Sequence, residues 1–226
     1  MNIIKSFMIV IVSLGLLTGC REQFSWHQKL TVTLDTPEGE VSGSSVTEVV
    51  VVSLPKTLPD AGVVDASLRG EAVAVEVTPG KYLFVLLKGG LGWAQDAYDK
   101  NQVGSVFEEN MRFIEAQVGG PAVAIRSDQL PLMVTFDNLS DSTTVQKVDP
   151  ANLAATFGTG VKLKSVMLAI TDEPVSQGRV ASLLSWIADY KAQHWRLNGS
   201  RCTACPISSD DLSDLIDPAD FAIWDK

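Results

Sequence analysis

The chain has 226 residues, which is enough for one large domain or two small ones. Hydrophobic residues make up 46% and charged residues 20%, a balance typical of a globular protein with a buried core. The 27 Asp and Glu residues outnumber the 18 Lys and Arg residues and give a net charge of -9. This acidic balance argues against nucleic acid as a partner, because phosphate binding requires a basic patch.

The first 20 residues predict a secretory signal. Lys5 provides a positive charge, an apolar run extends from Phe7 to Leu17, and small residues lead into Cys20. The run is too short to span a membrane comfortably as a permanent helix. The alternative is a short buried helix at the N-terminus of the fold.

The end of this segment, Leu17 to Cys20 (LTGC), resembles the lipobox of bacterial lipoproteins. In that family the signal peptide is cleaved before the cysteine, which then carries the acyl chains. The resemblance implies a signal peptide over residues 1–19 and attachment to a membrane through lipid on Cys20. Two or three acyl chains hold a protein stably at a bilayer. Arg21, in place of Asp, implies the outer membrane, with the protein facing the periplasm.

The mature chain is expected to begin with a lipidated tether over residues 20–27. A single globular domain over residues 28–226 follows, and it ends in an acidic segment. No other stretch approaches the ~18 continuous apolar residues of a membrane-spanning helix. Trp26 in the tether either dips into the lipid interface, as Trp does at membrane surfaces, or packs on the first hairpin.

Two β-hairpins are predicted in the first half of the domain. Leu30, Val32 and Leu34 alternate with polar residues over residues 28–35, which indicates a half-buried strand. A turn containing Pro and Gly leads into the second strand of this hairpin, over residues 41–53. The other strands expected are residues 71–77 and 81–88, which form the second hairpin, and residues 122–125, 132–136 and 161–171.

Helical spacing of apolar residues predicts a helix over residues 103–118 and an amphipathic helix over residues 180–195. Asp149 opens a short third helix as its N-cap. Residues 54–70 contain two Pro residues and are interpreted as a loop. This order favours an α+β fold with a mainly antiparallel sheet and two or three helices. The alternative is a β-sandwich with peripheral helices.

The sharpest motif is the C-x-x-C of Cys202 and Cys205. Export places both thiols in an oxidising compartment, and lipid on Cys20 leaves them as an even pair, so a structural disulfide is expected. The alternatives are a catalytic redox pair and a metal site with His194 as a third ligand. Too few residues follow Cys205 for the βαβ context of a thioredoxin-like site.

The remaining polar residues indicate no catalytic group, metal or cofactor. His27 lies close to the anchor and His194 at a helix end, which are poor places for a general base. Glu108 precedes Arg112 by four residues, the spacing of an exposed ion pair. The C-terminal acids lack the spacing of a calcium loop and are interpreted as solvated or N-capping residues. These acids are Asp210, Asp211, Asp214, Asp217 and Asp220.

Four short stretches resemble a group of uncharacterised proteobacterial envelope proteins. They are residues 26–33 (WHQKLTVT), 39–44 (GEVSGS), 157–161 (FGTGV) and 170–175 (ITDEPV). The resemblance implies no activity, ligand or catalytic residue.

These observations predict a lipid-anchored bacterial envelope protein whose domain is a binding or scaffolding module. The candidate partner is another envelope protein. An enzyme is the less favoured class. One alternative is an envelope hydrolase with carboxylate chemistry, which a deep pocket containing paired acids would favour. The other is a disulfide-handling protein using Cys202 and Cys205, which requires a reactive, exposed Cys202.

Overall fold

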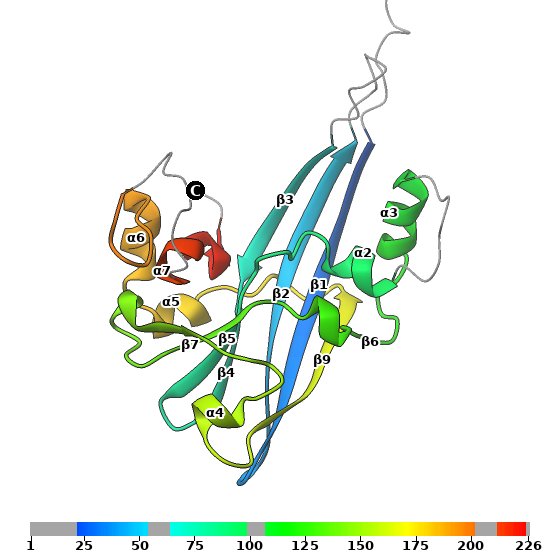
Figure 1. Ribbon diagram of the computed structural model, residues 1–226. Coiled ribbons are helices and arrows are strands. Elements are labelled where there is room, and N and C mark those ends of the chain that lie inside the picture. The colour runs from blue at the N-terminus through cyan, green and yellow to red at the C-terminus, as the bar shows by residue number, and fades with distance from the viewer. Residues whose placement is uncertain (1–21, 54–63, 99–106, 202–211, 225–226) are drawn as a thin grey trace, which may run out of the picture.

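The computed structural model describes residues 22–53, 64–98, 107–201 and 212–224 (Figure 1). The strands are β1 (Glu22–Thr36), β2 (Gly39–Ser53), β3 (Val64–Glu71), β4 (Val73–Thr78), β5 (Lys81–Val85), β6 (Val123–Ala124), β7 (Met133–Phe136), β8 (Val145–Lys147), β9 (Lys162–Thr171) and β10 (Ala222–Ile223). The helices are α2 (Trp93–Tyr98), α3 (Phe107–Glu115), α4 (Ala154–Phe157), α5 (Arg179–Leu183), α6 (Ile187–Gln193) and α7 (Leu212–Leu215).

The strands form two antiparallel sheets. A six-stranded sheet has the order β10-β3-β2-β1-β9-β6, and a four-stranded sheet has the order β4-β5-β7-β8. The two antiparallel sheets, together with a few helices, confirm the predicted α+β fold with a mainly antiparallel sheet.

A long hairpin of β1 and β2 forms the centre of the six-stranded sheet. Each strand has 15 residues, so the hairpin is about 50 Å long at about 3.3 Å per residue. Leu30, Val32 and Leu34 are buried together, as their alternation predicts. Residues 22–27, expected in the tether, are instead the first residues of β1, and Trp26 is buried in the core.

Two hydrophobic clusters lie on opposite faces of the four-stranded sheet. The first lies between the two sheets, and the second lies between the four-stranded sheet and the C-terminal helices. β5 contributes side chains to both clusters, because alternate side chains of a strand point to opposite faces of the sheet. Leu83 and Val85 belong to the first cluster, whereas Phe84 belongs to the second. The unbroken apolar run of this strand follows from that double burial.

A crossover segment, residues 172–178, joins β9 to α5. It passes the edge of β2 at Ser176, whose N–H donates to the carbonyl oxygen of Val46 (2.9 Å). The N–H of Val46 in turn donates to Oγ of Ser176 (2.9 Å). The segment therefore covers the part of β2 that lies beyond the end of β3, and it delivers α5 to the second cluster (Figure 1).

Four predicted elements differ from the structure. The short helix expected to open at Asp149 is α4, which begins at Ala154 with Leu153 as its N-cap. Residues 64–70, interpreted as loop, belong to β3. The helix predicted over residues 180–195 is divided into α5 and α6, because Leu184 leaves the helical conformation (φ -111°, ψ 78°). Val180, Leu184 and Ile187 all belong to the second cluster. The helix predicted over residues 103–118 is described from Phe107 and ends at Glu115.

Candidate functional site

Cys20, Cys202 and Cys205 lie outside the described residues, so lipidation and the disulfide remain predictions. The described structure begins close to Cys20, because the first residue of β1 is Glu22, two residues later. Glu22 pairs with Ser53 at the end of β2, and Ser53 pairs with Val64 at the start of β3. The first residues of β1 and β3 therefore lie at the same end of the six-stranded sheet.

His27 belongs to a row of polar side chains on the six-stranded sheet. Its Nδ1–H donates to the carbonyl oxygen of Glu173 (2.7 Å), and its Nε2 lies 3.7 Å from the Glu48 carboxylate. Glu48 also pairs with Arg69 (2.9 Å), and Lys29 pairs with Glu173 (2.8 Å). Both ring nitrogens thus face groups of the fold itself, and the row holds the crossover segment to the sheet.

The predicted ion pair between Glu108 and Arg112 does not form. The Arg112 guanidinium instead pairs with the Glu22 carboxylate (2.8 Å), and Glu108 accepts a hydrogen bond from the Ser53 hydroxyl (3.2 Å). Both side chains therefore attach α3 to the end of the six-stranded sheet rather than to each other. Phe24 lies below the same guanidinium, 5.9 Å from its central carbon to the ring centroid.

Two of the C-terminal acids have the N-capping role that the sequence predicts. Asp217 accepts a hydrogen bond from the N–H of Ala219 (2.7 Å), and Asp220 accepts one from the N–H of Asp217 (2.9 Å). Burial raises the pKa of Asp220, while the hydrogen bond from Asp217 and the charge of Lys88 oppose that shift. Across the described residues, no group of three or more His, Cys, Asp and Glu side chains could hold a metal ion.

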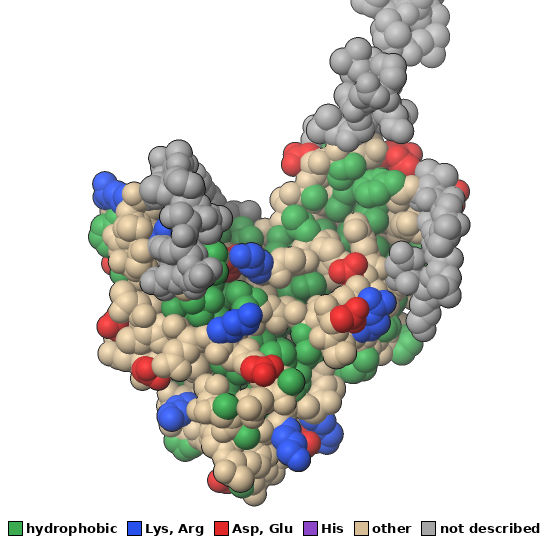
Figure 2. Space-filling model, viewed as in Figure 1, with side chains coloured by type: hydrophobic (Ala, Val, Ile, Leu, Met, Phe, Trp, Pro, Cys, Tyr) green, Lys and Arg blue, Asp and Glu red, His purple; other side chains and the backbone are tan. Residues whose placement is uncertain are grey.

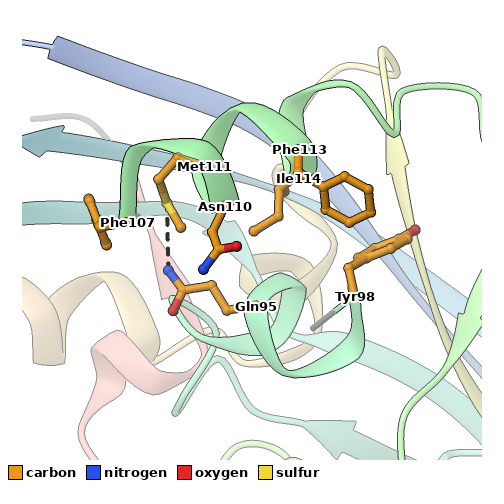
Figure 3. A pocket seen from close by; sticks show the side chains of 7 residues that line it. All are labelled: Gln95, Tyr98, Phe107, Asn110, Met111, Phe113 and Ile114. Carbon is orange, nitrogen blue, oxygen red and sulfur yellow. Dashed lines mark hydrogen bonds between the residues drawn. The ribbon is translucent and has the colours of Figure 1, made fainter. Parts of the chain in front are cut away.

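A small pocket lies between α2 and α3 (Figure 3). Its volume is about 130 Å³, close to the roughly 150 Å³ of a cavity that accepts one benzene ring. Phe107 lies at one end, and Tyr98 and Phe113 lie at the other. Gln95 donates through Nε2 to the sulfur of Met111 (3.7 Å).

The chemistry of this pocket does not favour hydrolysis. Tyr98 is the only acid or base among the residues known to line it. Burial raises the pKa of the Tyr98 hydroxyl, so the group stays protonated at neutral pH. The lining described therefore lacks the paired carboxylates that the alternative of an envelope hydrolase requires.

A second, open hollow of about 320 Å³ lies where α5 approaches the β1–β2 hairpin. Hydroxyl groups of Thr31, Ser42 and Ser44 line it, together with the exposed Arg179. Beside it, the buried carboxylate of Glu71 accepts hydrogen bonds from the N–H groups of Arg179 (3.3 Å) and Val180 (3.0 Å) at the start of α5. Glu71 therefore joins the end of β3 to the C-terminal helices.

The most distinctive surface is the edge of β3 that faces away from β2. In the described part of the chain, only β10 pairs with this edge, with Ala222 opposite Glu71 and Ile223 opposite Gly70. Residues 64–69 pair with β2 on the other side. Figure 2 shows that the surface is hollowed between the C-terminal helices and the end of the six-stranded sheet at which β1 and β3 begin. We call residues 64–68 of β3 the open edge.

Sequence reasoning missed the open edge because it interpreted residues 54–70 as a loop. A signal was nevertheless present. Val64, Ala66 and Leu68 alternate with polar residues, which is the period of a half-buried strand. The two Pro residues and the Gly that precede this stretch concealed the alternation.

Comparisons with known proteins assign no relative to this chain, because no family model, curated protein or solved structure gives a significant match. Among the helices that the structure describes, none is long and apolar enough to cross a membrane.

Proposed function

We propose that this chain is a lipid-anchored protein of the bacterial envelope, attached to the outer membrane through Cys20, whose folded domain binds another envelope protein. The observation that carries the proposal is the position of the open edge. It lies at the same end of the sheet as Glu22, the first residue of β1. Lipid on Cys20 therefore holds this edge close to the membrane surface, where other envelope proteins are concentrated.

The backbone groups and the charge of the chain also support a binding role. A strand edge offers backbone hydrogen-bonding groups to a partner, which is a recurrent mode of protein recognition. The acidic net charge of -9 favours a partner that contributes basic side chains.

Fractionation of cells that express the full chain tests the anchor. The wild-type protein is expected in the membrane fraction after a high-salt wash, and Cys20→Ser is expected to be unprocessed or released. Membrane retention and acyl labelling of Cys20→Ser equal to wild type would contradict the anchor.

Sedimentation of the envelope protein after mild detergent extraction tests the binding role. We expect a complex larger than one processed chain, which begins at Cys20, in its detergent micelle. A chain that sediments only as a monomer under these conditions would contradict the binding role.

A further inference from the structure

We infer that the open edge of β3 binds an extended segment of a partner protein, which adds to the six-stranded sheet as an antiparallel strand. This inference rests on the proposed function, because it names the surface and the kind of segment that the partner contributes. Strand addition satisfies the backbone groups of an open edge without any change in the sheet.

The register of the sheet shows which backbone groups are offered. Alternate residues of a strand direct their N–H and C=O groups to opposite edges. The N–H of Ala72 donates to the carbonyl oxygen of Phe221 (2.7 Å), on the β10 side of the chain. By this alternation Val64, Ala66 and Leu68 direct their N–H and C=O groups away from β2. Three backbone N–H donors and three carbonyl acceptors of the open edge are therefore directed toward a partner.

The antiparallel direction of the added strand is inferred from β10, which already pairs with this edge of β3. β10 is antiparallel to β3 and occupies the edge opposite Gly70 and Glu71. A partner segment that continues this pairing lies opposite residues 64–68, in line with β10. The chain thus already uses this edge for antiparallel pairing, and the partner extends an established ladder.

Side chains beside the edge define the composition of the partner segment. Val64 is 47% exposed although it shares the inner face of the sheet with the partly buried Leu68. The partner segment therefore places small or apolar residues on this inner face. On the outer face the exposed Asp65 favours a Lys or Arg opposite it.

A second copy of this chain does not fit the edge when both copies are anchored in one membrane. Two β3 strands that pair antiparallel about a two-fold axis point their anchored ends in opposite directions. The β1–β2 hairpin of the second copy, about 50 Å long, then projects past the anchored end of the first copy and into the bilayer. A segment of a different protein has no such constraint.

The test is photocrosslinking in cells that express the full, lipidated chain. A photoreactive benzoylphenylalanine replaces the exposed Ser67 of the open edge, and in a control chain it replaces the exposed Gln23 on β1. The variant Ala66→Pro removes a donor that faces the edge and leaves the ladder with β2 intact, since Pro is tolerated on that side of an edge strand. Ala66→Ser keeps the donor and is the matched control.

We expect an adduct with one protein from position 67, at least tenfold less from position 23, and at least a tenfold loss with Ala66→Pro but not with Ala66→Ser. Mass spectrometry of the adduct is expected to place the crosslink in a segment of alternating apolar and basic residues. If Ala66→Pro does not fold, Ala66→Lys replaces it, because a charge on the inner face also opposes strand addition.

Other results overturn the inference. A crosslink to a second copy, to the C-terminus of the same chain or to lipid assigns the edge to another occupant. An adduct that Ala66→Pro leaves unchanged shows that the backbone edge is not used. If the large detergent-extracted complex persists in the Ala66→Pro variant, the binding role stands and the open edge is not its surface.

Discussion

Replacement of Glu71 by alanine tests how β3 is joined to the C-terminal helices. The Glu71 side chain is 3% exposed and accepts hydrogen bonds from the N–H groups of Arg179 and Val180. Each hydrogen bond to a charged group contributes about 1.5 kcal/mol or more, so we expect Glu71→Ala to lower the free energy of unfolding by about 3 kcal/mol. At 2–4 °C per kcal/mol, the melting temperature is expected to fall by about 6–12 °C.

Urea titration and thermal melting followed by circular dichroism measure this change. Glu71→Gln retains one acceptor oxygen and is expected to lose about half as much stability as Glu71→Ala. Glu38→Ala, in the exposed turn of the first hairpin, is the control and is expected to change stability by less than about 0.5 kcal/mol. A melting temperature of Glu71→Ala within about 2 °C of wild type would refute the view that this carboxylate holds α5.

Three further predictions concern packing, pH dependence and the cysteines. A Cβ at Gly43 would lie 2.8 Å from the carbonyl oxygen of Ala74, so Gly43→Ala is expected to cost about 1–3 kcal/mol in urea titration, whereas Ser44→Ala on the exposed side is expected to be near neutral. Burial raises the pKa of Asp220 in the folded state, so the folded chain holds this proton more tightly than the unfolded chain does. The free energy of unfolding of wild type should therefore fall, relative to that of Asp220→Asn, as the pH rises from about 4 to 7. Equal pH profiles of the two proteins would contradict the burial of this group. Alkylation of the non-reduced envelope protein is expected to leave Cys202 and Cys205 unmodified, and two alkylated thiols would exclude the disulfide.

The elements that the sequence predicts well are those with one buried face. The alternation around Leu30, Val32 and Leu34 predicts both the strand and its buried side, and the structure confirms both. β5 could be assigned as a strand, but its apolar run could not reveal that its two faces belong to different clusters. That information lies in the packing of the C-terminal helices, which are distant in sequence.

The candidate site was the part least accessible to sequence reasoning. β3 pairs with β2 over residues 64–69, but the two Pro residues and the Gly that precede it make the whole stretch resemble a loop. Whether a strand edge is open depends on which other strands reach it, and here only the two residues of β10 do so among the residues described. The break between α5 and α6 at Leu184 was likewise hidden, because residues 180–195 contain no Pro or Gly that would mark it in the sequence.

The mass of the N-terminal peptide of the protein purified from the membrane fraction tests the lipid anchor most directly. The proposed anchor predicts a peptide that begins at Cys20 and carries a diacylglyceryl group on the cysteine sulfur. A peptide that begins at Met1, or at a residue after Cys20 without lipid, would contradict it.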